Sequence, residues 1–123
     1  MRLAVNGAAG FPILMPLWFM WADNSFWAAM KPTAGLVQGL RRDGRCAFDI
    51  SIETPPYKGV RGRGTAEVID DGLPVLKQLL QRYLGEGSAR FQTWLLERSA
   101  DECAIRITPE TLTAWDFGAR MKS

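Results

Sequence analysis

Hydrophobic and polar residues alternate with a period of two in the middle of the chain. Between residues 45 and 52, one face carries the apolar side chains of Cys46, Phe48, Ile50 and Ile52. Between residues 55 and 69, one face carries Arg61, Arg63, Thr65 and Glu67, and the other carries the small residues Gly62, Gly64 and Ala66. Because side chains alternate across a strand, both segments are predicted to be β-strands. Glycine weakens a strand interior, so Gly62 and Gly64 predict a bulge, a barrel corner, or close approach by a ligand or a second backbone.

The rest of the chain is predicted to form further strands joined by short turns. They are expected at Leu3–Asn6, Phe11–Trp21, Phe26–Met30, Glu102–Thr108 and Thr111–Phe117, with turns at residues 7–10 and 22–25. Strands that follow one another in runs, without β-α-β alternation, favour an antiparallel arrangement. The prediction is a single, mainly β domain over residues 1–123, built as a small barrel of five to seven strands.

Helical spacing of apolar residues predicts three short helices inserted between the strands. The first is expected over Ala34–Arg42 with Thr33 as its cap. The second follows Asp70 and Asp71 and ends at Gly85, and its inward face is expected to carry Leu73, Leu76, Leu80 and Tyr83. The third begins near Ser88.

The apolar run Leu3–Ala22 is about as long as a membrane span. Gly7 and Gly10 interrupt it as turn residues, and Pro12 and Pro16 would break any helix through it. The run is therefore predicted to be strands, with no membrane association. No pattern typical of a signal peptide precedes it, so a cytoplasmic location is expected.

Composition narrows the class of partner. The chain is 47% hydrophobic with 5 Trp and 6 Phe, enough for a core and for apolar surface at a subunit interface. Its net charge is only +2 and its basic residues are dispersed, which argues against a nucleic-acid partner and is compatible with an anionic small molecule.

The absence of histidine excludes much catalytic chemistry. The chain has no His, so it has no Ser-His or Cys-His pair and no His-containing zinc site. Cys46 and Cys103 each lie in an apolar run and are expected to be buried thiols, without a metal. No side chain is predicted to be catalytic.

The segment Lys31-Pro32-Thr33 stands directly before the first predicted helix. Backbone N–H groups, the helix dipole, a hydroxyl and an ammonium group could together hold a phosphate there. A solvated lysine beside an ordinary threonine cap is the simpler interpretation of these residues alone.

The order of several short segments resembles the pyridoxamine 5′-phosphate oxidase-like, FMN-binding split-barrel family. The resemblance rests on Pro16-Leu17-Trp18-Phe19, Phe26-Trp27-Ala28-Ala29, Leu40-Arg41-Arg42-Asp43-Gly44-Arg45, Pro55 to Gly64, and Ile107-Thr108-Pro109-Glu110 with Trp115-Asp116-Phe117. It covers nearly the whole chain. What it implies is a six-stranded antiparallel split β-barrel that forms a homodimer, with two FMN molecules at the subunit interface.

The resemblance also implies which residues bind the cofactor. The flavin phosphate is expected near the turn before the first helix, Lys31–Gly35, and the ring against the segment Pro16–Phe19. The implied cofactor-binding residues are Leu17, Trp18, Phe19, Met30, Lys31, Thr33, Ala34, Gly35, Lys58, Gly59 and Arg61.

Two departures from the family pattern bear on function. Many relatives have a phosphate-binding lysine at the helix start, where this chain has Ala34-Gly35-Leu36, so Leu36 stands at the lysine position. The segment with which true pyridoxamine-phosphate oxidases hold their substrate has no counterpart after Phe117. That specific activity is therefore not expected.

The resemblance implies a flavin-dependent oxidoreductase with a small-molecule substrate, in which the protein positions the cofactor. One alternative is a reductase of the same fold that uses a deazaflavin, whose longer acidic tail would suit Lys58, Arg61 and Arg63. The other alternative is a non-catalytic dimeric carrier of an aromatic ligand such as haem.

Overall fold

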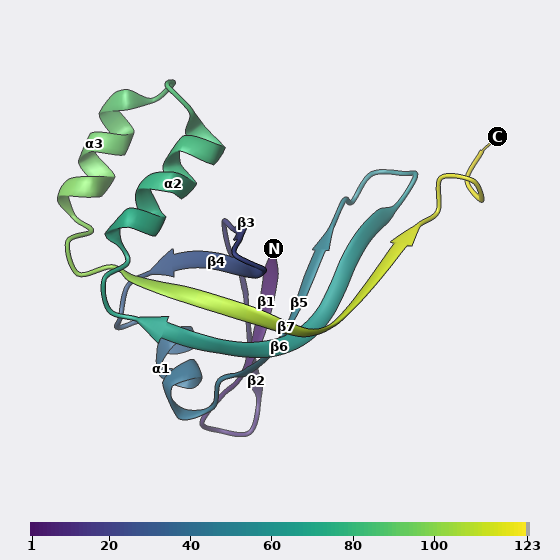
Figure 1. The fold of residues 1–123 in the computed structure, drawn as a ribbon, viewed down its shortest axis with the longest axis horizontal. Helices are drawn as coiled ribbons and strands as arrows, with labels where there is room; N and C mark the ends of the chain where they lie inside the picture. The colour runs from purple at the N-terminus through teal and green to yellow at the C-terminus, as the bar shows by residue number, and fades with distance from the viewer. Residues whose placement is uncertain (123) are drawn as a thin grey trace.

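The computed structural model describes residues 1–122, which form seven strands and three short helices (Figure 1). The strands are β1 (Arg2–Asn6), β2 (Pro12–Pro16), β3 (Met20–Ala22), β4 (Ser25–Met30), β5 (Arg45–Ser51), β6 (Lys58–Ile69) and β7 (Cys103–Asp116). The helices are α1 (Gly35–Arg42), α2 (Leu73–Leu84) and α3 (Ala89–Glu97). All strands belong to one antiparallel sheet in the order β2-β1-β5-β6-β7-β4-β3. The mainly β prediction is confirmed, but the sheet has seven strands in place of the six that the resemblance implied, and it does not close into a barrel because β2 and β3 remain at its two edges.

The additional strand comes from the segment Phe11–Trp21, which was predicted to be one strand. It is two, because β2 pairs with β1 at one edge of the sheet while β3 pairs with β4 at the other. Residues 17–19 join them outside the sheet. Both predicted turns are confirmed, and in the second Asp23 and Asn24 have φ values of 53° and 55°, as the central residues of a type I′ hairpin turn do.

The main core lies between the sheet and α1. One face of the strands buries Leu3, Val5, Cys46, Phe48, Ile105 and Ile107, and α1 covers them with Leu36, Val37 and Leu40. Helix α2 packs on the opposite face, where Val75 and Leu79 contact Ala104. Figure 1 shows α1 and the α2–α3 pair on opposite sides of the strands.

The glycines of β6 allow strand β7 to approach closely. A Cβ atom at Gly62 would lie 2.0 Å from the carbonyl oxygen of Thr111, and one at Gly64 would lie 2.2 Å from that of Thr108. The pairing register shifts between Arg63 and Gly64, so the predicted irregularity is present, but the extra residue is Glu110 on β7. Across it β7 runs unbroken, although two separate closing strands were predicted.

Two predictions about the helices are corrected. Thr33 is not the cap of α1, since the N-cap is Ala34 without a side-chain hydrogen bond and the Thr33 carbonyl accepts one from the Gln38 amide. Tyr83 does not face the core, because it lies in the last turn of α2 with 38% of its surface exposed. Gly85 ends α2 at a φ of 58°, as expected of a C-terminal glycine.

The Asp43 carboxylate joins α1, β1 and β5, and this link predicts acid sensitivity. It accepts hydrogen bonds from the Arg45 side chain at 2.8 Å and from the Asn6 amide at 2.9 Å. These bonds hold the pKa of Asp43 well below its usual range. A pKa lowered by folding stabilises the protein above the unfolded-state pKa of about 3.9, and this stabilisation is lost as the pH falls below it.

We therefore expect Asp43→Asn to lose less stability than the wild type between pH 5 and pH 2. The measurement is the urea midpoint of each protein across that range. Asp70→Asn, which alters an exposed ion pair with Arg41, serves as the control and should follow the wild type. An unchanged pH profile for Asp43→Asn would contradict the assignment.

Candidate functional site

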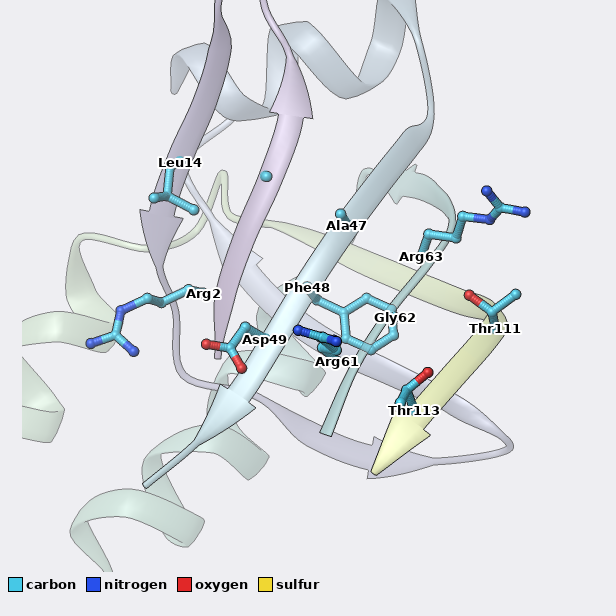
Figure 2. A pocket seen from close by; sticks show the side chains of 11 residues that line it. Arg2, Leu14, Ala47, Phe48, Asp49, Arg61, Gly62, Arg63, Thr111 and Thr113 are labelled. Atoms are coloured by element: carbon cyan, nitrogen blue, oxygen red, sulfur yellow. The ribbon is translucent and has the colours of Figure 1, made fainter. Parts of the chain in front are cut away.

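A groove of about 580 Å³ lies on the face of the sheet opposite α1 (Figure 2). We call it the sheet groove. It is lined by Arg2, Ala4, Leu14, Ala47, Phe48, Asp49, Arg61, Gly62, Arg63, Thr111 and Thr113. Its size is in the range of small-molecule sites.

The strand register arranges the floor of the sheet groove in two rows. One row runs across four strands as Arg2, Asp49, Arg61 and Thr113. The next row runs as Ala4, Ala47, Arg63 and Thr111. Figure 2 shows arginines on both flanks of the groove and the threonine hydroxyls on β7. The first row is therefore polar throughout. In the second row, β1 and β5 contribute only the small side chains of Ala4 and Ala47.

A second groove of about 550 Å³ adjoins the first, and we call it the loop groove. Its lining residues are Met1, Arg2, Pro16, Leu17, Trp18, Phe19, Asp49, Ile50, Ser51 and Glu53. Arg2 and Asp49 line both grooves. We call Leu17, Trp18 and Phe19 the aromatic wall of the loop groove, and Arg61 and Arg63 the cationic floor of the sheet groove. The wall and the floor thus lie next to each other.

The three loop residues of that wall are held at both ends. The Leu17 N–H donates to the Met1 carbonyl at 2.8 Å, and the Met1 amine donates to the Leu17 carbonyl at 3.1 Å. The Phe19 N–H donates to the Tyr83 hydroxyl at 3.0 Å, which in turn donates to the Phe19 carbonyl at 3.2 Å. Between them, the Trp18 ring stacks on Tyr83 with centroids 5.1 Å apart and planes 9° apart.

Asp49 carries an unsatisfied acceptor where the two grooves meet. Its Oδ2 accepts a hydrogen bond from Ser51 at 3.1 Å, while its Oδ1 is buried and has no donor among the described residues. A buried acceptor without a donor is uncommon in folded proteins.

The arginines of β6 have no carboxylate partner within the part of the chain that the structure describes. Arg2 pairs with Glu53, but neither Arg61 nor Arg63 forms an ion pair within residues 1–122. The Arg61 guanidinium lies 5.6 Å from the centre of the Trp115 ring. Both cations are exposed and available to an anionic group on the sheet groove.

The residues predicted to hold a phosphate lie outside both grooves. Met30, Lys31, Thr33, Ala34 and Gly35 form the connection between β4 and α1. The Lys31 ammonium donates to the Asp101 carboxylate at 2.7 Å and also to the Arg98 carbonyl. This hydrogen bond lowers the pKa of Asp101. Lys31 is thus paired with Asp101 in the turn before β7. The two residues are 70 positions apart in the sequence, and the sequence alone did not predict their contact.

Lys58 and Gly59 lie at a third place, near the end of the sheet. They line a hollow of about 360 Å³ with Ile52, Trp115 and Asp116 among others. A Cβ atom at Gly59 would lie 2.7 Å from Cζ2 of Trp115, so glycine there admits the indole. The eleven predicted residues therefore lie in three places. Leu17–Phe19 and Arg61 line the two adjoining grooves, the predicted residues between positions 30 and 35 lie outside both grooves, and Lys58 and Gly59 line the third hollow.

Other chemistry receives little support from the described residues. Within residues 1–122, no group of three or more acidic or cysteine side chains is placed to hold a metal ion. Burial raises the pKa of the Cys46 thiol to about 11, which leaves it protonated near neutral pH. No helix in the same part of the chain is long and apolar enough to span a membrane.

No family model matches the chain, and no curated protein matches it either. Several solved structures do match the chain. Protein Rv2991 from Mycobacterium tuberculosis matches with a TM-score of 0.80 and 23% identity, over 99% of this chain and 80% of that one. An F420 reductase matches with a TM-score of 0.73 and 19% identity, over 91% of this chain and 86% of that one. A pyridoxinephosphate oxidase family protein from Clostridium acetobutylicum matches with a TM-score of 0.66 and 16% identity, over 95% of this chain and 79% of that one.

Two further matches have other ligands in their names. One is a FAD-binding protein from Mesorhizobium loti, with a TM-score of 0.66. The other is HutZ, the haem storage protein from Vibrio cholerae, with a TM-score of 0.70. The chain therefore has the fold of the pyridoxamine 5′-phosphate oxidase-like split-barrel proteins, as the sequence predicted. At identities of 23% or less, these likenesses establish the fold and leave the activity to be argued from the site.

Proposed function

We propose that the protein binds FMN and acts as a flavin-dependent oxidoreductase on a small-molecule substrate. The observation that carries the proposal is the adjoining pair of grooves, which joins an aromatic wall at Trp18 to a cationic floor at Arg61 and Arg63. FMN is a planar ring system with an anionic tail, and this is the combination that such a surface suits. Names of proteins that share the fold point to the same chemistry, since they include a FAD-binding protein and an F420 reductase.

The chain's own residues would bind, orient and shield the cofactor. Trp18 and Phe19 supply apolar surface for the ring. Arg61 and Arg63 can balance the charge of the tail. When bound, the flavin supplies hydride or electron transfer. No side chain of this site is needed as a general acid or base.

The proposal includes a homodimer with the cofactor at the subunit interface. The free ends of β5, β6 and β7 project from the body of the molecule (Figure 1). These strands and the residues that follow them carry exposed apolar side chains, among them Leu112 at 52%, Ile52 at 42% and Phe117 at 37%. An apolar surface of this kind favours burial against a second copy. A partner could then close the two grooves, which are open to solvent in one protomer.

Two other ligands are alternatives to FMN. A deazaflavin with a longer acidic tail is favoured by the exposed pair of cations at Arg61 and Arg63. Haem is suggested by the likeness to HutZ, although this chain has no His to serve as an axial ligand.

The decisive experiment is a titration of purified protein with FMN, a deazaflavin and haem, following ligand fluorescence or visible absorption. We expect FMN to bind at micromolar concentration or more tightly, and Trp18→Ala to weaken binding at least about fivefold, since an aromatic contact contributes about 1 kcal/mol beyond its buried area. Trp94→Ala is the matched control, because Trp94 is a half-exposed indole on α3, and it should bind as the wild type does. Absence of binding by all three ligands up to about 1 mM, or equal binding by Trp18→Ala, would overturn the proposal.

The contact between Lys31 and Asp101 allows a separate test of the predicted phosphate site. Lys31 lies outside both grooves of its own protomer, so it meets the phosphate only if the cofactor is shared across the proposed dimer interface, and it must then leave the Asp101 carboxylate. We expect Asp101→Asn to increase the preference for FMN over riboflavin, which lacks the phosphate, by several fold. Lys31→Gln should reduce that preference by about tenfold, because a hydrogen bond to a charged group contributes about 1.5 kcal/mol or more. Unchanged FMN to riboflavin ratios in both variants would show that Lys31 takes no part in phosphate binding.

A further inference from the structure

The loop that forms the aromatic wall has no strand partner of its own. Residues 17–19 lie between β2 and β3, which belong to opposite edges of the sheet. Backbone groups outside a sheet need other partners, and for Phe19 both its N–H and its carbonyl are satisfied by a single side chain, the hydroxyl of Tyr83. That contact spans 64 residues of sequence.

The same tyrosine also fixes the side chains of the wall. Its ring stacks almost in parallel on Trp18, which limits rotation of the indole that lines the loop groove. The neighbouring Arg82 guanidinium lies 5.2 Å from the centre of the Phe19 ring and 5.5 Å from that of Tyr83. The last turn of α2 therefore contacts backbone and side chains of the wall together.

Helix α2 is held in place by buried apolar residues, so Tyr83 contacts the loop from a fixed position. Its residues Val75, Leu76, Leu79 and Leu80 are buried, and Val75 and Leu79 pack on the sheet at Ala104. Tyr83 itself is 38% exposed, so burial in the core does not explain why it is placed there. Its contacts are made with the loop.

We propose that Tyr83 is a positioning residue that holds Leu17–Phe19 in the conformation that receives a planar aromatic ligand. The proposal rests on the proposed function of the loop groove. It assigns to α2, which lines neither groove, the role of setting the shape of the wall. The chemical class of ligand follows from the wall, because a fixed indole suits a flat ring better than an aliphatic ligand.

The test is Tyr83→Phe, which keeps the stacking ring and removes only the hydroxyl. Hydrogen exchange at the Phe19 amide should become at least tenfold faster, while exchange at the Leu17 amide, which bonds to Met1, should not change. The dissociation constant for FMN should rise at least tenfold, and quenching of flavin fluorescence at saturation should decrease. A purely structural role would lower the unfolding temperature without changing the quenching at saturation.

Trp94→Phe is the control, because Trp94 is an exposed aromatic residue on α3, at 49%, that lines neither groove and lies away from the proposed dimer surface. It should bind FMN and exchange at Phe19 as the wild type does. An unchanged Phe19 exchange rate in Tyr83→Phe, or unchanged FMN affinity and quenching, would overturn the proposal. If the wild type binds neither FMN nor a deazaflavin, the proposed function fails, while the exchange rate at Phe19 still decides whether Tyr83 holds the loop.

Discussion

Leu36→Lys should leave the protein largely unfolded under conditions in which the wild type is stable. Leu36 is 1% exposed and lies in the core between α1 and the sheet. Removing a buried leucine side chain costs about 2–5 kcal/mol, and an unpaired ammonium group in the same place adds a desolvation cost. The sum approaches the whole stability of a typical domain, about 5–15 kcal/mol. Urea unfolding followed by circular dichroism would measure the loss.

Gly35→Lys is the matched control for that variant. It adds the same side chain one position earlier on α1, where a Cβ atom would meet nothing within 4 Å. We expect its urea midpoint to remain near that of the wild type. A Leu36→Lys protein as stable as Gly35→Lys would show that position 36 is not a core position. The result also bears on phosphate binding, because Leu36 faces the core and its lack of charge is no sign of a lost cofactor site.

Gly62→Val should be the second strongly destabilising substitution. A Cβ atom at position 62 would lie 2.0 Å from the Thr111 carbonyl oxygen and 3.0 Å from Cζ of Phe48. The first neighbour is backbone of a paired strand and cannot rotate away, so β6 and β7 would have to separate. Overpacking of this kind costs about 3 kcal/mol or more. The measurement is the free energy of unfolding in urea.

The control for this variant is Gly87→Ala, in the turn between α2 and α3. There the nearest atom to an added Cβ, the Leu84 carbonyl oxygen, is 3.5 Å away, which is ordinary contact. Its stability should be unchanged within about 1 kcal/mol. If Gly62→Val also unfolds at the wild-type urea concentration, the close approach of β7 to β6 is wrong.

The fold was predictable from sequence where it depends on local pattern. Alternation predicted the faces of β5 and β6, because side chains alternate along each strand. Glycine inside β6 predicted irregular pairing there, but not that the extra residue would lie on β7. The break at residues 17–19 was not predictable. An apolar run looks the same whether it remains with one neighbour or passes from one edge of the sheet to the other.

The candidate site was predictable only in part, for the same reason. Trp18 and Arg61 were recognised because their segments resemble a known family, and the structure places them on adjoining grooves. Asp49, Arg2 and Tyr83 were missed. Asp49 becomes a candidate only when the register sets it between Arg2 and Arg61, and Tyr83 only when α2 is docked beside the loop. These contacts join residues far apart in the sequence, so no local spacing pattern predicts them.

The position of β7 in the sheet has a consequence for how the chain is synthesised. Within residues 1–122, strands β3 and β4 join the remaining strands only through β7, which follows all the other described elements in sequence. While the ribosome adds residues from the amino end, the β3–β4 hairpin must wait with Phe26 and Ala28 uncovered until the final strand has emerged. The sheet can therefore be completed only after β7 has left the ribosome, and a nascent chain halted before Cys103 would expose apolar surface that chaperones bind.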